Sequence, residues 1–208
     1  MGSLVSERAR TLQRLLGAIV ALSGMMSLPP AALAWWWGEA TVFAFLESFL
    51  VPFAAGLVLW FPVRNAQYEL RLRDGFLIVS AAWIIACLVT ALPFVLAPPH
   101  LSYTDAVFEA TSGLTTTGAT VITGIEHLPR SVLFFRSSLN YFGGMGIVIL
   151  AVAILPMLRV GGMQLFRLES SDKSEKVLPR ANQIATGISV IYAILTALCA
   201  LVFWDGGM

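Results

Sequence analysis

Five apolar runs, each long enough to cross a lipid bilayer as a helix, constrain the fold of this chain more than any other feature. They cover approximately residues 12–34, 40–63, 75–97, 131–158 and 181–204. A bilayer core of about 30 Å takes about 20 apolar residues as a helix, which satisfies its own backbone hydrogen bonds in lipid. The composition agrees, because 58% of the 208 residues are hydrophobic and 12% are charged, about half the charged share of soluble domains. We predict an all-α integral membrane protein with five transmembrane helices.

The first run admits two interpretations. Arg8, Arg10 and Arg14 lie before or at the start of it, an apolar stretch follows from Leu15, and Ala32-Leu33-Ala34 closes it, as in a cleavable signal peptide. Its length also suits a retained span, and it ends at Trp35-Trp36-Trp37, residues that favour the headgroup layer. We interpret the run as a retained helix and keep cleavage as the alternative.

A shorter element of different character lies between the third and fourth runs. Residues 101–112 are too few to span a bilayer as a helix, and Ser102, Thr104 and Asp105 at their start have the spacing of a capping box. A stretch of small and hydroxylated residues with two glycines follows, up to residue 121. At membrane depth, polar backbone occurs only where protein buries it or where it lines a water-filled cavity. We predict a half-helix that enters the membrane and stops at Gly113, followed by a functional loop.

Nearly all basic residues gather at alternate ends of the apolar runs. The three groups are Arg8, Arg10 and Arg14; Arg64, Arg71 and Arg73; and Arg159, Arg167, Lys173, Lys176 and Arg180. Together they hold eleven of the 13 lysines and arginines, and such residues mark the cytoplasmic ends of membrane helices. All three groups share one side only if residues 101–121 enter and leave the membrane on the same side. The charges therefore predict a re-entrant loop, a cytoplasmic N-terminus and a final residue outside.

The re-entrant loop has the chemistry of a cation site. A cation that enters a membrane needs oxygens in place of its hydration water, and rings of backbone carbonyls supply them where glycine allows the required conformation. The C-terminus of a half-helix adds partial negative charge. We expect Thr116, Thr117, Gly118 and Ala119 to be the ligands, through their backbone carbonyls and a threonine hydroxyl. A plain turn between two helices is the alternative.

Three charged residues lie within or beside the membrane segments. Glu109 on the half-helix is either an ion-pathway group, the default for an ionisable residue at this depth, or a residue that holds the loop through backbone amides. Arg136 is expected to reach the headgroups or to pair with a carboxylate such as Glu126. Glu47 is expected at a helix contact or an interface.

The sequence gives no sign of an enzyme or of a nucleic-acid-binding protein. It contains no His-Glu-x-x-His motif, no Gly-x-Ser-x-Gly motif and no paired intramembrane carboxylates. Cys87 and Cys199 lie inside apolar runs, and His100 and His127 have no ligand spacing around them. A net charge of +1 also argues against nucleic acid as a partner.

Six short segments spread over nearly the whole chain form a specific combination. They are Leu70-Arg71-Leu72-Arg73-Asp74-Gly75, residues 108–120 around the loop, Leu128-Pro129-Arg130, Phe142-Gly143-Gly144-Met145-Gly146, Ile154-Leu155-Pro156 and residues 161–167. Together they resemble the Trk/Ktr/HKT superfamily of potassium transporters, and the bacterial Trk-type membrane subunits most closely. The resemblance implies four successive helix–pore-loop–helix repeats around a central pore, with two extra helices in front.

This resemblance divides the chain into four parts. Residues 1–74 correspond to the two leading helices with a cytoplasmic N-terminus and loop, and residues 75–158 to the first helix–pore-loop–helix repeat. Residues 159–180 correspond to a cytoplasmic linker, and residues 181–208 to the first helix of a truncated second repeat. Because one loop replaces the four of the family, we expect an N-terminal fragment of a longer protein, or a truncated product.

The resemblance also implies a function and partners. It implies potassium uptake across the bacterial inner membrane, with K⁺ as the transported ion and without an organic cofactor. It further implies a homodimer in the full-length form, a cytoplasmic nucleotide-binding regulatory ring and surrounding membrane lipid. Gly118 stands at the filter glycine position, where serine accompanies sodium preference in parts of the family. A non-conducting fragment or assembly scaffold is the alternative, and a homotetrameric cation channel is a less favoured one.

Overall fold

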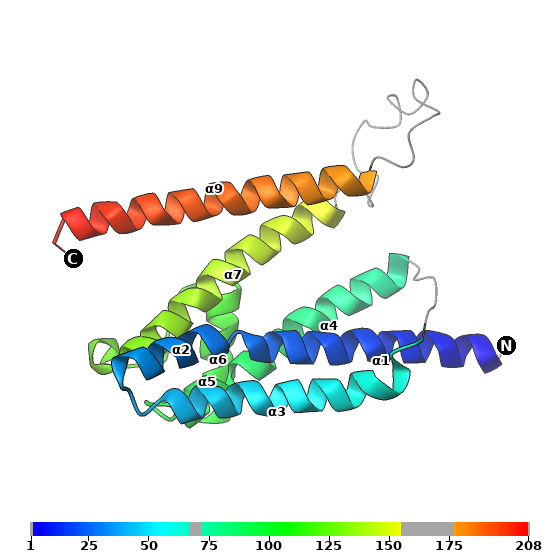
Figure 1. Ribbon diagram of the computed structural model, residues 1–208, viewed down its shortest axis with the longest axis horizontal. Helices are drawn as coiled ribbons and strands as arrows, with labels where there is room; N and C mark the ends of the chain where they lie inside the picture. Colours follow the sequence, from blue (N-terminus) through cyan, green and yellow to red (C-terminus); the bar gives the residue numbers. More distant parts are fainter. Residues whose placement is uncertain (1, 67–71, 155–176, 208) are drawn as a thin grey trace, which may run out of the picture. The chain divides into compact units, whose positions relative to one another are not determined.

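The computed structural model describes residues 2–66, 72–154 and 177–207, and all regular structure in these ranges is helical (Figure 1). The helices are α1 (Gly2–Met25), α2 (Leu28–Trp37), α3 (Val42–Trp60), α4 (Leu72–Thr90), α5 (Leu92–Leu96), α6 (Tyr103–Leu114), α7 (Arg130–Ile154) and α9 (Val177–Asp205), with short 3-10 turns η1 (Phe61–Val63) and η2 (Ile125–His127). The chain divides into two compact units, residues 1–140 and 141–208. The loop and its surroundings belong to the first unit.

Four described segments are long and apolar enough to cross a membrane. They are Glu7–Trp37, Val42–Val63, Arg73–Leu96 and Thr186–Asp205, and they match the first, second, third and fifth predicted runs. The fourth run falls on α7, whose 25 residues extend over about 37 Å at 1.5 Å per residue. The predicted end of this run, at Leu158, lies outside the described residues, so a membrane span by the fourth run stays a prediction.

Proline divides two of the predicted runs into successive helices. Pro29 is the second residue of α2, and Pro93 is the second residue of α5. Proline has no backbone N–H and a fixed φ near −65°, so it is tolerated in the first turn of a helix and disrupts a helix interior. The first run is therefore α1 followed by α2, and the third is α4 followed by α5. Gly38, with φ of 68°, then ends α2.

The core of the first unit surrounds α6. Phe45 of α3, Phe94 of α5 and Phe135 of α7 are fully buried, and the ring of Phe135 lies 5.6 Å from that of Phe45 and 5.3 Å from that of Phe94. On α6 itself, Ala106 and Ala110 are fully buried, and small residues of this kind allow close approach of neighbouring helices. This packing fixes α6 against the elements on either side of it.

Gly113 has a different role from the one predicted. A Cβ atom added to Gly113 would lie 2.9 Å from the Cβ of Leu139 on α7, so glycine is needed for the close approach of the two helices. The half-helix does not stop at Gly113 but continues to Leu114. The prediction was wrong because a glycine in an apolar context can serve packing as well as helix termination.

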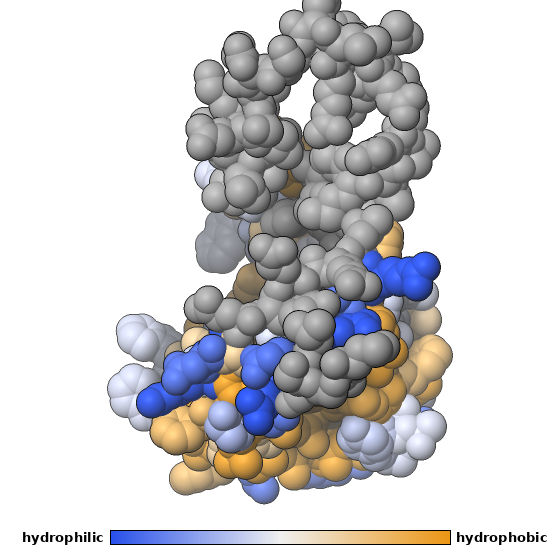
Figure 2. Space-filling view, turned by 90° about the vertical axis from the view of Figure 1, so that its right-hand side faces the viewer, coloured by the Kyte–Doolittle hydropathy of each residue, from blue (hydrophilic) through white to orange (hydrophobic). Residues whose placement is uncertain are grey.

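Arginines of α1 join the ends of α1, α3 and α4. Arg8 donates two hydrogen bonds to Oδ1 of Asp74, at 2.9 and 2.5 Å, and Asp74 is fully buried. Arg14 donates to the carbonyls of Arg64 and Ala66 at 3.3 and 2.7 Å. Figure 2 looks onto the side where α1 begins, and strongly hydrophilic residues gather there beside a hydrophobic flank. These contacts bring two of the predicted basic groups together, while their cytoplasmic location stays a prediction.

Candidate functional site

The start of α6 is fixed by Ser102, the N-cap residue of the predicted capping box. Ser102 Oγ accepts a hydrogen bond from the Asp105 N–H at 3.2 Å and donates to Asp105 Oδ2 at 2.8 Å. The Asp105 carboxylate also lies in the first helical turn, where negative charge is favourable. With 12 residues, α6 extends over about 18 Å, too short to cross a bilayer core of about 30 Å.

The end of α6 is a Schellman motif with threonine in the position usually taken by glycine. The Thr116 N–H donates to the Gly113 carbonyl at 3.0 Å, and the Thr117 N–H donates to the Ser112 carbonyl at 2.9 Å. Thr116 has a φ of 56°, a left-handed conformation that is rare for a β-branched residue and costs about 1–3 kcal/mol. The chain therefore reverses direction immediately after the helix, at a strained residue.

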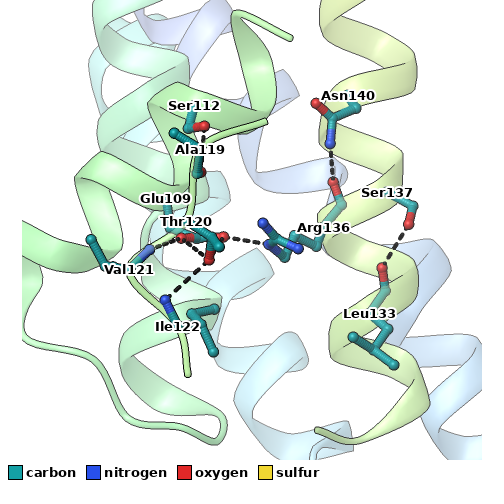
Figure 3. A network of polar contacts seen from close by, with 10 residues as sticks. All are labelled: Glu109, Ser112, Ala119, Thr120, Val121, Ile122, Leu133, Arg136, Ser137 and Asn140. Carbon is teal, nitrogen blue, oxygen red and sulfur yellow. Dashed lines mark hydrogen bonds and ion pairs between the residues drawn. The ribbon is translucent and has the colours of Figure 1, made fainter. Parts of the chain in front are cut away.

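After this reversal the chain runs back along α6 (Figure 3). Ser112 Oγ donates to the Ala119 carbonyl at 2.6 Å, and the Glu109 carboxylate accepts from the Val121 N–H at 3.2 Å. Later residues of the loop thus pair with earlier residues of the helix, which is an antiparallel course. The loop leaves toward the end at which α6 began, as a re-entrant segment must.

Glu109 is the main anchor of the loop. Its side chain is 1% exposed, and Thr120 Oγ1 lies 3.0 Å from each of its carboxylate oxygens. The same carboxylate accepts from the Val121 N–H and from Nε of Arg136. Charge-assisted hydrogen bonds to a buried carboxylate are about twice as strong as neutral ones. Of the two interpretations of Glu109, this geometry supports the residue that holds the loop.

Arg136 pairs with Glu109 of α6 and not with Glu126. The predicted partner, Glu126, is largely exposed and lies 3.7 Å from Nε2 of His127. A buried carboxylate requires a partner, whereas an exposed one is solvated by water. Arg136 thus pairs with a carboxylate, as one of the two expectations had it, but the example given for the partner, Glu126, was wrong, because burial and not sequence proximity decides which carboxylate the guanidinium contacts.

The four predicted ligands are all on the exposed part of the loop. In the described part of the chain, no donor contacts the carbonyl oxygens of Thr116, Thr117 or Gly118, while that of Ala119 accepts from Ser112. Gly118 has a φ of 77°, and a Cβ atom there would meet nothing within 4 Å. Glycine is thus needed at this position for its conformation and not for space.

The role of Glu39 was not predicted. This residue follows Gly38 in the turn before α3, and its carboxylate accepts from the N–H groups of Arg130 and Ser131 at 2.9 and 3.1 Å. It therefore caps the N-terminus of α7, where free N–H groups and a partial positive charge favour a carboxylate. The contact joins residues about 90 positions apart, so no local pattern could predict it.

A metal ion can also be bound by side chains, without the backbone carbonyls of the loop. Within residues 2–66, 72–154 and 177–207, no group of three or more His, Cys, Asp or Glu residues could hold a metal ion. Glu47, which was expected at a helix contact or an interface, is exposed on α3.

Comparison with known proteins finds one matching family model and several similar curated proteins. The model of the family described as "TrkH: Cation transport protein" matches residues 41–205. The Trk system potassium uptake protein TrkH of Vibrio parahaemolyticus is 45% identical over 202 residues, and that of Salmonella typhimurium is 47% identical over 203. The protein TrkG of Escherichia coli is 35% identical over 206 residues.

The chain also matches a solved structure of one of these relatives. The crystal structure of the potassium transporter TrkH from Vibrio parahaemolyticus matches with a TM-score of 0.80 and 42% identity, covering 96% of this chain and 40% of that one. The alignments with the two TrkH proteins cover 96% of this chain, and the alignment with TrkG covers 98%. The chain spans 42% of the length of each of these three relatives.

Proposed function

This chain belongs to the TrkH family of cation transport proteins, and from this membership we propose that it acts in potassium uptake and supplies one of four loops of a selectivity filter. Members of the family are ion transporters and not enzymes. Four membrane-length apolar helices and this membership make the chain a multi-pass membrane protein. We place it in the bacterial inner membrane with a cytoplasmic N-terminus.

One observation carries the proposal: neighbouring carbonyls of Thr116, Thr117 and Gly118 accept no hydrogen bond from the described residues and lie on an anchored loop. Carbonyl oxygens replace the hydration shell of K⁺ in filters of this kind. The C-terminus of α6 directs partial negative charge toward the same loop. Ala119 would contribute the second lone pair of its carbonyl, because Ser112 already occupies the first.

A carbonyl cage needs loops from about four directions, and the described residues contain one. The ion path would therefore require three further loops beside this one. K⁺ is the transported ion in this proposal, and no organic cofactor takes part. A non-conducting scaffold is the second candidate function. It is favoured by the same observation, because a single loop cannot surround an ion.

The proposed partners follow from the family and from the surface. Membrane lipid would cover the exposed apolar side chains of α3 and α9, such as Phe43 and Leu201. The transporter would act as a homodimer, and a cytoplasmic nucleotide-binding ring would meet the end of the helices where Arg8 and Arg14 lie. The printed name "Trk system" of the relatives agrees with a protein that works with other components.

Uptake by a chimeric transporter tests the proposed function. Residues 1–208 replace the matched region of the Vibrio parahaemolyticus relative, in a bacterial strain without potassium uptake systems. We expect growth at low K⁺ and saturable Rb⁺ uptake, because this chain would complete the filter with its own loop. A chimera that is monodisperse and inserted in the membrane but takes up no Rb⁺, beside an active parent, would contradict the proposal.

The 208-residue chain alone is the matched control for the number of loops. In liposomes we expect no saturable K⁺ flux from it, because one loop surrounds an ion on one side only. Saturable, K⁺-selective flux from the purified chain would instead support a channel made of four copies.

A further inference from the structure

We infer that Glu39, in the turn between the leading helices α2 and α3, is a positioning residue for the filter loop. The inference rests on the proposed function, since it assigns to the leading helices a part in shaping the ion path. Glu39 also precedes residues 41–205, the region matched by the family model. The positioning role of Glu39 therefore rests on the contacts that its carboxylate makes.

The carboxylate of Glu39 holds two elements together. Oε1 accepts from the Arg130 N–H at 2.9 Å, and Oε2 accepts from the Ser131 N–H at 3.1 Å and from the Ser131 hydroxyl. Thr41 Oγ1 lies 3.3 Å from Oε2 and 2.8 Å from the Ser131 hydroxyl oxygen. Ser131 is fully buried and Thr41 is 5% exposed, so water cannot easily replace the bonds that these two residues make, whereas the bond from the Arg130 N–H is exposed.

These bonds fix the first turn of α7, which is also where the filter loop ends. The loop leaves α6 after Leu114 and joins α7 at Arg130. Its first part is held by α6 through Ser112 and Glu109. Among the described residues, Glu39 is the carboxylate that holds the first turn of α7, directly after the loop, and it comes from outside the helix–loop–helix repeat.

The path from Glu39 to the filter continues along α7. Arg136 lies six residues after Arg130, about 9 Å along the helix axis, and it pairs with the carboxylate of Glu109. Glu109 in turn holds Thr120 and the N–H of Val121. A shift or rotation of the start of α7 would move the Arg136 guanidinium away from Glu109 and loosen the loop.

Glutamine cannot replace Glu39 in this contact. Both carboxylate oxygens accept bonds, and one of them accepts from two hydroxyls and one N–H. In glutamine, one of the two positions becomes an NH₂ group, a donor that faces donors. The variant keeps the shape of the side chain and removes the charge that complements the helix N-terminus.

Hydrogen exchange on the 208-residue chain tests the inference directly. In Glu39→Gln we expect the amides of Val121 and Ile122 to exchange about tenfold faster, the size of the effect when a bond to a charged group is lost. Both amides are bonded in the wild type, to Glu109 and to Thr120 Oγ1. The control is Glu47→Gln, which removes an exposed carboxylate from α3 and should leave these amides unchanged.

Faster exchange confined to the first turn of α7, with normal protection at Val121 and Ile122, would overturn the inference. Ser131→Ala is the milder second variant, in case Glu39→Gln does not fold. It removes one donor and keeps the two backbone bonds to Glu39. We expect a smaller acceleration at the same two amides, and no change there would likewise overturn the inference.

Ion selectivity separates a positioning role from a merely stabilising one. In the chimeric transporter, Glu39→Gln should lower the ratio of Rb⁺ to Na⁺ uptake, whereas Glu47→Gln should not. If the loop loosens in Glu39→Gln but the wild-type chimera takes up no ion, the proposed function fails and the positioning role stands. If the wild-type chimera is selective and Glu39→Gln alters neither exchange nor selectivity, the positioning role fails alone.

Discussion

A Glu109→Gln transporter is expected to lose about nine tenths or more of its K⁺ uptake while it still folds and inserts. Glu109 is 1% exposed and holds Thr120, the Val121 N–H and Arg136 together. Removing one partner of a buried ion pair costs about 3–5 kcal/mol because the other charge is left unpaired. Each 1.4 kcal/mol is a factor of ten, so even about 3 kcal/mol shifts the loop about a hundredfold toward disordered forms. The measurement is tracer Rb⁺ uptake normalised to the amount of transporter in the membrane.

The matched control is Glu126→Gln, which removes a largely exposed carboxylate from the same loop and should leave uptake nearly unchanged. A double-mutant cycle with Arg136→Gln then isolates the pair. Because the double variant leaves no unpaired charge, it should be less damaging than the sum of the single changes. Normal uptake by Glu109→Gln, or strictly additive effects in the cycle, would show that this ion pair does not support the loop.

The second large effect is expected at Gly118. With Gly118→Ser, the ratio of K⁺ to Na⁺ uptake should fall about tenfold, since a side chain at positive φ costs about 1–2 kcal/mol and turns the adjacent carbonyls. The added Cβ atom meets nothing within 4 Å, while the φ of 77° disfavours any side chain. The effect would therefore come from the conformation of the loop and not from a clash.

Gly124→Ser is the control for backbone strain in the selectivity experiment. Gly124 lies in the same loop with a φ of 69°, and a Cβ atom there would meet the His127 side chain at an ordinary 3.5 Å. Both variants thus introduce similar strain, but only Gly118 lies among the proposed ligands. Dual-isotope uptake of Rb⁺ and Na⁺ compares them. Equal loss of selectivity in the two variants would count against the assignment of Gly118 to the filter.

Local patterns in the sequence predicted much of this fold. Run length and hydropathy identified the four membrane-length segments, and the spacing of Ser102 and Asp105 located the start of α6. These features depend on residues that are close together in the sequence, within a single helix or its first turn. The family membership came from short segments distributed along the chain, whose combination is specific.

Holding the loop was one of the two interpretations of Glu109, but the pairing of Arg136 with Glu109 and the contact of Glu39 with α7 were not predicted from the sequence, because they join distant residues. Arg136 and Glu109 are 27 residues apart, and the Glu39 contact crosses about 90. Burial decides these pairings, and burial follows from the packing of whole helices. The left-handed conformation of Thr116 was also not predicted. Gly113 and Gly118 lie nearby, and glycine is the residue that usually adopts this conformation. A threonine in that conformation reflects the surrounding contacts and not its own preference.

Anomalous diffraction from crystals of the transporter soaked in Rb⁺ tests the central claim most directly, because Rb⁺ is a close substitute for K⁺ and scatters anomalously. We predict an anomalous peak beside the carbonyl oxygens of Thr117 and Gly118, weakened or lost in Gly118→Ser and retained in Gly124→Ser. An active transporter whose Rb⁺ peaks all lie away from residues 116–119, or whose peak beside this loop is unchanged in Gly118→Ser, would contradict the account.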